Sequence, residues 1–296
     1  MAKTGFIGLG IMGKPMAKNL LAGGMDLLVH DLNEGAVAEL VAQGAKKAGP
    51  EEIGASCPVI FTILPNGPIV QSVLFGPGGV SAKIARGAIV CDMSSVTPQE
   101  SRQCHEKLGG MGVGFVDAPV SGGEPGAING TLAFMAGGDQ KDFDALRPYF
   151  DIMGSSAILV GPSGSGSVTK LANQMIVNLT IASVSEAFTL AVKAGADPQK
   201  VYEAIRGGLA GSAVLDAKVP MMIRRDFRPG GKISINHKDI KNVLASAHAI
   251  DAPVFLSSVL FEILQALKVG GHMDEDHSAI VKFFERNAAV EVTGKS

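Results

Sequence analysis

The chain has 296 residues, of which 46% are hydrophobic and 18% charged, a composition typical of a globular protein large enough for two cores. The formal net charge is -2, and Lys and Arg are scattered, so we expect no basic surface for nucleic acid. Cys57, Cys91 and Cys104 lack CxxC spacing, and the first residues resemble a strand instead of a signal peptide. These features predict a cytoplasmic protein.

A membrane partner is not expected. A membrane-spanning helix needs about 18 uninterrupted apolar residues. The longest apolar segment follows Lys170, and it is interrupted by Asn173, Gln174, Asn178 and Glu186. The sequence therefore predicts a soluble protein.

Short apolar runs alternate with stretches of helical length in the first part of the chain. The expected strands are Thr4–Ile7, Leu27–His30, Val59–Leu64 and Ala88–Asp92. Three further runs extend the sheet in directions that the pattern leaves open: Gly114–Asp117, Thr131–Ala136 and Ile158–Val160. Alternating strands and helices are typical of a parallel sheet with crossover helices. We therefore predict a Rossmann-type, doubly wound α/β domain over residues 1–162.

The pattern becomes helical after Gly164. Apolar residues recur at helical spacings on more than one face between Leu171 and Val192, which predicts one long, largely buried helix ending near Gly195. Shorter helices are expected from Pro198 onward and over about residues 211–224, 236–250, 253–268 and 276–288. Residues 163–296 are thus predicted to form an all-α domain that the long helix joins to the first.

A glycine-rich motif directly follows the first strand and opens a helix: Gly8-Leu9-Gly10-Ile11-Met12-Gly13. In a dinucleotide-binding loop the first glycine permits a tight turn and the second lets the backbone approach the pyrophosphate. The third lets helix and strand pack closely, and the helix N-terminus faces the anion. The motif predicts dinucleotide binding, with a purely structural turn as the alternative.

Asp31 ends the second strand, eighteen residues beyond Gly13. A carboxylate at this place accepts hydrogen bonds from the adenosine ribose hydroxyls and repels a 2′-phosphate. The sequence therefore favours NAD, with NADH as the reductant, although no feature excludes NADP. The alternative for Asp31 is a solvated carboxylate in a turn.

Polar or glycine-rich segments follow several of the predicted strands. They are Leu64-Pro65-Asn66, Ser94-Ser95 and the segment from Asp117 to Gly123. Ligands of open parallel sheets bind beyond the carboxyl ends of the strands. We therefore expect these segments to line one crevice, although each alone could be only a turn or a helix cap.

Four motifs occur in order along the chain: Gly8–Leu20, Asp117–Gly123, Gly164–Asn173 and Lys238-Asp239. With them the chain resembles, over nearly its whole length, the β-hydroxyacid dehydrogenase family. The resemblance implies hydride transfer between a nicotinamide dinucleotide and a small hydroxy- or oxo-acid. Two further stretches, Ile205–Lys218 and Asp276–Ala279, resemble the tartronate semialdehyde reductase branch of that family. This likeness implies reduction of tartronate semialdehyde to D-glycerate.

Lys170 and Asn173 follow a glycine-rich loop and share one helix face because they are three residues apart. Lys170 matches the catalytic lysine of the family. Reduction of an aldehyde places negative charge on oxygen, so a cation within reach stabilises the transition state and supplies the proton. The resemblance implies that Asn173 orients the lysine and a substrate oxygen. A solvated surface lysine is the alternative for Lys170.

The resemblance also assigns binding residues. Ser121, Gly122 and Gly123 match the substrate loop of the family, where a hydroxyl and backbone amides can bind a carboxylate; an ordinary glycine turn is the alternative. Ser95 matches a position whose hydroxyl contacts the cofactor. Lys238 matches a lysine that reaches the cofactor from the helical domain, with a solvated helix-surface charge as the alternative. Leu64, Pro65 and Asn66 are predicted to complete the cofactor site.

The six histidines show no spacing that suits a metal site, so we expect no metal. His277, beside Asp276, could cap the last helix or reach the substrate, and the structural role is favoured. The long apolar helix is expected to meet a second subunit, in a homodimer or homotetramer. Two kinds of functional alternative stay open. One is the activity of 3-hydroxyisobutyrate dehydrogenase or of another short β-hydroxyacid dehydrogenase, and the other is a dinucleotide-binding sensor without catalysis.

Overall fold

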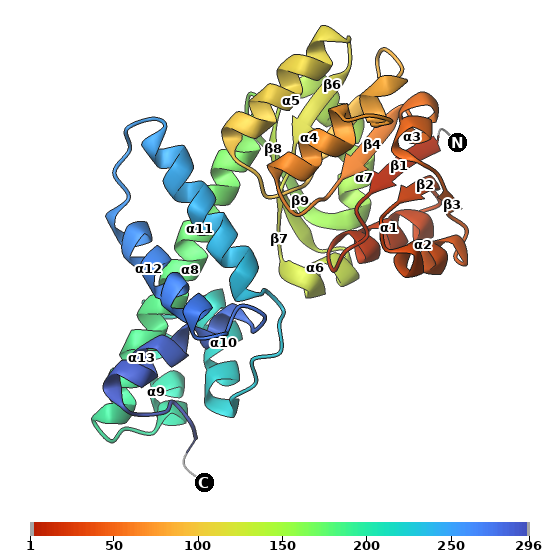
Figure 1. Cartoon of the computed structure of the whole chain (residues 1–296). Helices are drawn as coiled ribbons and strands as arrows, with labels where there is room; N and C mark the ends of the chain where they lie inside the picture. Colours follow the sequence, from red (N-terminus) through yellow and green to blue (C-terminus); the bar gives the residue numbers. More distant parts are fainter. Residues whose placement is uncertain (1–2, 295–296) are drawn as a thin grey trace. The chain divides into compact units, whose positions relative to one another are not determined.

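The computed structural model describes residues 3–294, and the chain divides into two compact units, Met1–Lys170 and Leu171–Ser296 (Figure 1). The sequence places the domain boundary between residues 162 and 163, before the long helix. In the structure the division falls inside that helix, α8 (Ser165–Lys193). Its first turn and Lys170 therefore belong to the first unit.

The first unit is built on one mixed sheet. Within residues 3–294 the sheet has nine strands in the order β3-β2-β1-β4-β5-β6-β8-β7, and β9 pairs with β8. All pairs from β3 to β6 are parallel, and β8 runs antiparallel to β6 and β7. The strands are β1 (Lys3–Ile7), β2 (Asp26–His30), β3 (Lys46–Lys47), β4 (Val59–Thr62), β5 (Ile89–Asp92), β6 (Gly114–Asp117), β7 (Val120–Ser121), β8 (Leu132–Gly137) and β9 (Gly154–Gly161).

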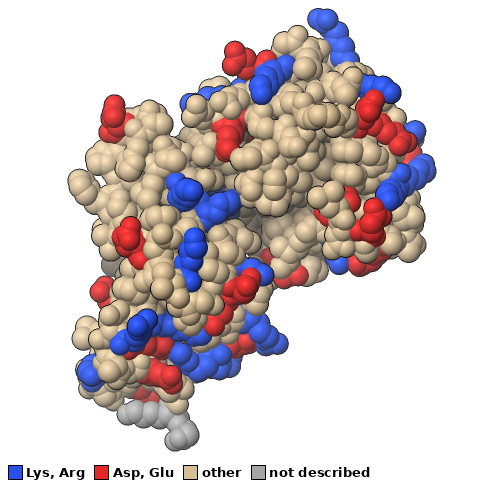
Figure 2. All heavy atoms as spheres, in the orientation of Figure 1, with Lys and Arg blue, Asp and Glu red and all other residues tan. Residues whose placement is uncertain are grey.

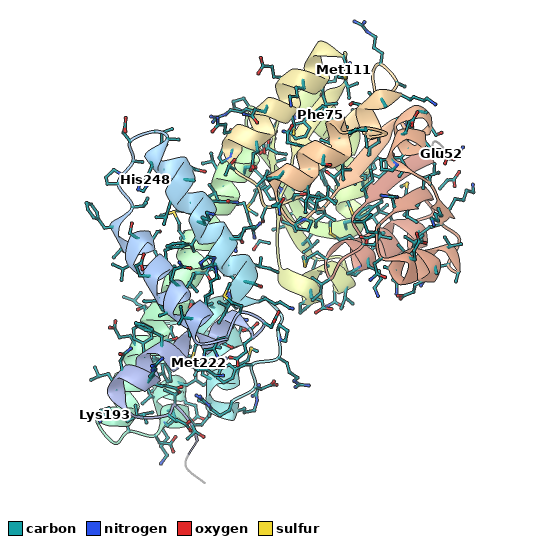
Figure 3. All side chains as sticks on the ribbon, viewed as in Figure 1. Glu52, Phe75, Met111, Lys193, Met222 and His248 are labelled. Carbon is teal, nitrogen blue, oxygen red and sulfur yellow. The ribbon has the colours of Figure 1, made fainter. Side chains whose placement is uncertain are left out.

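Helices cover both faces of this sheet, which confirms the doubly wound fold. Every residue of β4 and β5 is buried, as the continuous apolar runs predict. One face packs against α1 (Gly13–Ala22), α2 (Glu34–Val41) and α7 (Gln140–Met153). The other packs against α3 (Pro50–Ser56), α4 (Gly67–Phe75) and α5 (Pro98–Gly110). Figure 3 shows the side chains that fill these layers.

Two strands were not predicted, because two residues are too few for a periodic signal. One is β3, and the other is β7, which lies inside the segment predicted as the substrate loop. The following residues form a short helix, α6 (Gly123–Asn129). The fourth strand ends at Thr62 and not at Leu64, because the amide of Leu64 bonds to a side chain instead of a neighbouring strand. The loop after β4 therefore begins slightly earlier than expected.

The second unit is all-helical, as predicted. Its core collects buried side chains from every helix, among them Ile181, Phe188, Met222 and Leu264. After α8, the elements within the described residues are α9 (Pro198–Ile205), α10 (Ala213–Arg224), α11 (Ile233–His248), α12 (Phe255–Val269), the 3-10 turn η2 (His277–Ile280) and α13 (Val281–Ala288). The helix predicted over 276–288 is thus split into η2 and α13.

Asp276 lies directly before η2 and caps it. Its carboxylate accepts hydrogen bonds from the amide of Ser278, which caps η2, and from the amides of Gly230 and Gly231. It also pairs with Lys218 Nζ at 2.9 Å. Burial acts to raise the pKa of Asp276, but His277, Lys218 and the backbone donors together bring it below its usual value. The two stretches that resemble the tartronate semialdehyde reductase branch are therefore joined by one buried ion pair.

By length and composition α8 is apolar enough to cross a membrane, although polar residues interrupt its apolar sequence. Only 39% of its most apolar 18-residue stretch is buried, so the prediction of a largely buried helix was wrong for this unit. Its buried face also carries polar side chains, Gln174 and Asn178, which hydrogen-bond to Asn236 of α11. Such pairing is typical of a helix in the core of a globular unit. Core helices can match membrane-spanning helices in length and composition.

Candidate active site

The glycine motif forms the turn between β1 and α1. Gly8 has a φ of 101°, and a Cβ there would lie 2.2 Å from the carbonyl oxygen of Ile63. A Cβ at Gly13 would lie 1.9 Å from the carbonyl oxygen of Gly8, so only glycine allows the helix to start this close to the strand. A Cβ at Gly10 would meet no atom within 4 Å. The space beside Gly10 is therefore open to a phosphate group.

A cleft of about 780 Å³ opens at this turn. Leu9, Gly10 and Ile11 line it together with residues at the start of α2. Asp31 is tied to the cleft, since its Oδ2 accepts a hydrogen bond from the amide of Leu9 and its Oδ1 accepts one from the amide of Asn33 at 2.7 Å. The structure thus brings the end of β2 and the glycine turn together.

The wall of this cleft carries two cations and one anion. Lys14 and Lys18 of α1 both pair with Glu39 of α2, and Lys14 Nζ lies 2.8 Å from Glu39 Oε2. Hydrogen bonds from the two lysines lower the pKa of Glu39 to about 2. These lysines are therefore already matched by a carboxylate. Basic and acidic side chains are likewise mixed over the face of the molecule in Figure 2.

A buried carboxylate, Asp92, organises the loops after β4 and β5. Its Oδ1 accepts hydrogen bonds from Thr62 Oγ1 at 2.7 Å and from Ser94 Oγ at 2.6 Å. Ser94 Oγ in turn accepts a hydrogen bond from the amide of Leu64 at 2.8 Å. Burial raises the pKa of Asp92, against the effect of the two hydroxyl donors. Two of the predicted cofactor loops are thus held together by a residue to which sequence reasoning gave no role.

The other predicted residues of these loops differ in their contacts and in their exposure to solvent. Asn66 caps α4, where its Oδ1 accepts a hydrogen bond from the amide of Ile69 at 3.0 Å. This is the helix-cap alternative that the sequence left open. Pro65 is exposed, and Ser95 is half-buried directly after Ser94. Their contact with a cofactor stays a prediction.

Asp117, at the end of β6, holds the start of α8. Its Oδ1 accepts a hydrogen bond from the amide of Gly164 at 2.7 Å, and its Oδ2 accepts one from the amide of Ser167 at 2.8 Å. The first turn of α8 packs tightly there, since a Cβ at Gly166 would lie 2.3 Å from the carbonyl oxygen of Met135. The carboxylate therefore caps the helix that carries Lys170.

Lys170 meets the predicted substrate loop within the first unit. Its Nζ donates a hydrogen bond to the carbonyl oxygen of Val120 at 2.8 Å. Val120 directly precedes Ser121, and both belong to β7. Gly122 follows with a φ of 133°, and Gly123 begins α6. The second and third motifs of the sequence are thus brought into contact.

The third and fourth motifs meet within the second unit. Asn173 Nδ2 donates to Oε1 of Gln174 at 3.0 Å, and Gln174 Nε2 donates to Oδ2 of Asp239 at 2.7 Å. Lys238 Nζ lies 3.0 Å from Oδ1 of Asp239. Asn173 and Lys238, which the sequence assigned to substrate and cofactor, are therefore linked through two intervening side chains.

Some residues of the site carried a sequence signal for a structural role that was not predicted. Asp92 and Asp117 are carboxylates at the ends of apolar strands, where a buried acid needs hydrogen-bond donors. Gln174 is a polar residue four positions after Lys170 in an apolar helix. Val120 contributes only a backbone carbonyl, for which the sequence holds no signal.

Two family models match the chain. One, described as the NAD binding domain of 6-phosphogluconate dehydrogenase, matches residues 3–161. The other, described as NAD-binding of NADP-dependent 3-hydroxyisobutyrate dehydrogenase, matches residues 164–284. The matches cover both units and agree with the fold and with the glycine turn.

Similar proteins align over nearly the whole chain. It is 41% identical to 2-hydroxy-3-oxopropionate reductase of Escherichia coli (strain K12), with 96% of this chain and 97% of that protein covered. It is 37% identical to 2-(hydroxymethyl)glutarate dehydrogenase of Eubacterium barkeri, covering 99% and 98%. The solved structure of Mycobacterium tuberculosis 3-hydroxyisobutyrate dehydrogenase matches with a TM-score of 0.89 at 30% identity, covering 95% and 98%.

The fold and the glycine turn define an oxidoreductase that uses a nicotinamide dinucleotide, NAD or NADP. The chain belongs to the β-hydroxyacid dehydrogenase family, whose members include 3-hydroxyisobutyrate dehydrogenase. It therefore acts on the CH–OH group of a hydroxy acid or on the corresponding carbonyl. The open space beside Gly10 and the amides at the start of α1 fit the pyrophosphate of such a cofactor.

The buried position of Asp117 predicts a pH dependence of stability. Burial raises the pKa of this carboxyl from its usual range to about 6; the amides of Gly164 and Ser167 oppose the rise, and Asp92 adds to it. A carboxyl with a raised pKa in the folded state stabilises the fold fully below its unfolded pKa, and this contribution is lost as the pH rises through the folded pKa.

Asp117→Asn removes this titration. The free energy of unfolding of the wild type minus that of D117N should therefore fall by about 2 kcal/mol between pH 4 and pH 7. Urea unfolding at four pH values measures it. Asp151→Asn, on an exposed carboxylate of α7, is the surface reference. A difference between wild type and D117N that does not change with pH would refute the prediction.

Proposed function

We propose that the protein reduces tartronate semialdehyde to D-glycerate with NADH, reversibly, and that Lys170 is the general acid and base. The observation that carries this proposal is the contact of Lys170 Nζ with the carbonyl of Val120 at 2.8 Å, directly before Ser121. It puts a cation beside the loop that the family resemblance assigns to the substrate. The 41% identity to E. coli 2-hydroxy-3-oxopropionate reductase supports this choice of substrate.

The bound nicotinamide supplies the hydride. Lys170 donates a proton from Nζ to the aldehyde oxygen as negative charge develops there, and the neutral amine then takes a proton from water. General acid catalysis of this kind contributes about 10² to 10⁴ in rate. The hydroxyl of Ser121 and the amides of Gly122 and Gly123 donate hydrogen bonds to the substrate carboxylate. In the oxidation direction Lys170 acts as the base.

Two further roles follow the family resemblance. Asn173 orients a substrate oxygen, and Lys238 contacts the cofactor. Their side chains are joined through Gln174 and Asp239 within the second unit, so the two roles share one hydrogen-bonded chain. Ser95, Leu64 and the glycine turn from Gly8 to Gly13 contact the cofactor in the same proposal.

The second candidate function is 3-hydroxyisobutyrate dehydrogenase activity, favoured by the TM-score of 0.89 to the M. tuberculosis enzyme of that name. Its substrate has a methyl group where tartronate semialdehyde has a hydroxyl. Steady-state reduction of tartronate semialdehyde and methylmalonate semialdehyde, each with NADH and NADPH, decides between them. A site built for the hydroxyl should discriminate strongly against its absence. Turnover of neither aldehyde would favour the non-catalytic sensor.

Lys170→Ala should lower kcat at least 10²-fold, because the transition state loses its proton donor. NADH binding, followed by fluorescence titration, should stay as in the wild type. Lys193→Ala is a matched control, since Lys193 lies at the other end of α8 and also donates to a backbone carbonyl, that of Ala288, at 2.9 Å. Near-normal turnover by K170A would disprove the role of Lys170.

Asp31→Ala should weaken the binding of NADH more than that of NADPH, because the variant loses a hydrogen-bond acceptor for the ribose and a charge that repels the 2′-phosphate. The ratio of the two dissociation constants measures this effect. Glu34→Ala is the control, because Glu34 is an exposed carboxylate three residues further along. An unchanged ratio in D31A would show that another residue recognises the ribose.

A homodimer or homotetramer in the cytoplasm is part of the same proposal. A groove of about 1070 Å³ in the second unit is lined mainly by apolar side chains of α8 and α12. On α12, Leu256 and Val259 are 70% and 63% exposed, and α8 exposes Ile176 and Leu190. Apolar patches of this kind mark subunit contacts. The three free, buried cysteines are compatible with a reducing compartment.

Leu256→Glu should shift the protein toward the monomer, because a charge then enters the apolar patch. Light scattering coupled to size-exclusion chromatography measures the mass. Met111→Glu is the control, since Met111 is an exposed apolar residue of the first unit (Figure 3). A monomeric wild type would refute the expected assembly.

A further inference from the structure

Gln174 makes three side-chain hydrogen bonds in the interior of the second unit, where it is 8% exposed. Its Nε2 donates to Oδ2 of Asp239 at 2.7 Å and to Oδ1 of Asn236 at 3.2 Å, both on α11. Its Oε1 accepts a hydrogen bond from Nδ2 of Asn173 at 3.0 Å. The amide group of Gln174 thus uses both of its hydrogens and its oxygen.

The chemistry of Asp239 decides the direction of these hydrogen bonds. A carboxylate only accepts hydrogen bonds, so the nitrogen of the Gln174 amide must face it. The oxygen of Gln174 then faces Asn173, and an oxygen can accept only from the nitrogen of the Asn173 amide. The usual ambiguity between the oxygen and the nitrogen of an amide is therefore removed for both residues.

Asn236 provides a second acceptor for the amide nitrogen of Gln174. Asn236 receives hydrogen bonds at Oδ1 from both Gln174 and Asn178, while its own Nδ2 donates to the carbonyl oxygen of Lys232 at 2.9 Å. Asn236 is 3% exposed, so its amide cannot exchange these partners for water. Two fixed acceptors on α11 therefore hold the nitrogen of Gln174.

We infer that Gln174 is a positioning residue through which Asp239 sets the direction of the Asn173 amide. Nδ2 of Asn173 is turned toward Gln174, and its carbonyl oxygen Oδ1 is turned away. This inference rests on the proposed function, because it assigns Asn173 the task of recognising the substrate side group. Oδ1 is a hydrogen-bond acceptor, so it suits a hydroxyl donor and is unsuited to a methyl group or a second carboxylate.

The consequence concerns selectivity between the two candidate substrates. Tartronate semialdehyde carries a hydroxyl next to the reacting aldehyde, and methylmalonate semialdehyde carries a methyl group there. If Gln174 is lost, the Asn173 amide loses its fixed direction and the hydroxyl loses its acceptor. The preference for the hydroxyl substrate should then weaken, while proton transfer by Lys170 and NADH binding are retained.

Gln174→Met keeps the length of the side chain but removes its hydrogen bonds. We expect kcat/KM for tartronate semialdehyde to fall about 10-fold, as for the loss of one hydrogen bond, and kcat/KM for methylmalonate semialdehyde to change less than about twofold. Gln174→Asn is the second variant, because its shorter side chain keeps an amide that cannot span the same three partners. It should lose the preference to a similar extent.

Asn178→Leu is the matched control. Asn178 lies one turn further along α8, is fully buried and donates to the same oxygen of Asn236 at 3.0 Å. Its loss should lower thermal stability to a degree comparable with Q174M while leaving the substrate preference as in the wild type. If N178L changed the substrate preference as much as Q174M does, the effect of Q174M would reflect a general loss of stability. That result would overturn the inference.

A direct measurement separates this inference from the proposed function. In protein labelled with ¹⁵N at asparagine, the side-chain NH₂ signal of Asn173, assigned with Asn173→Asp, should shift in Q174M and Q174N but stay in place in N178L. This test needs no turnover, so it remains decisive if the wild type reduces neither aldehyde and the proposed function fails. An unshifted Asn173 signal in both Gln174 variants would overturn the inference.

Discussion

A single buried carboxylate, that of Asp117, holds the start of α8 against the sheet, and the placement of Lys170 depends on it. The carboxylate accepts hydrogen bonds from two backbone amides, that of Gly164 just before the helix and that of Ser167 in its first turn. These two hydrogen bonds hold the first turn of the helix, and they oppose the rise that burial causes in the pKa of this carboxyl. One turn later Lys170 reaches the carbonyl of Val120, which follows Asp117 closely in the chain. The same segment therefore supports the lysine at both ends of its turn.

The proposed chemistry is divided between the two units of the chain. The first unit contains the glycine turn, the Ser121 loop and Lys170, to which the proposed function assigns cofactor binding and proton transfer. The second contains Asn173 and Lys238, joined by two buried polar side chains. Because carboxylates only accept hydrogen bonds, Asp239 gives this second group a fixed polarity. The proposal thus assigns proton transfer to Lys170, beside Val120, and recognition of the side group to Asn173, beside Gln174.

The sequence predicted the class of fold and the helical second half because buried parallel strands and long helices leave strong periodic patterns. It predicted neither β7 nor α6, since two strand residues and one short helix carry no comparable signal. Of the candidate site, it singled out Lys170 and Asn173, whose roles stay predictions, but not their hydrogen-bond partners Val120 and Gln174. Backbone carbonyls and amide directions depend on tertiary contacts, which no local pattern encodes.

The helix α8 carries Lys170 in one unit and Asn173 in the other. A helix turns by about 100° per residue, so inserting or deleting one residue between them would turn one side chain far from the other. Substitutions after Asn173, in contrast, leave the angle between the two side chains around the helix axis unchanged. In the proposed mechanism, substitutions in α8 after Asn173 and in α11 would therefore change which side group is recognised, while the helical pitch would keep the angle between Lys170 and Asn173.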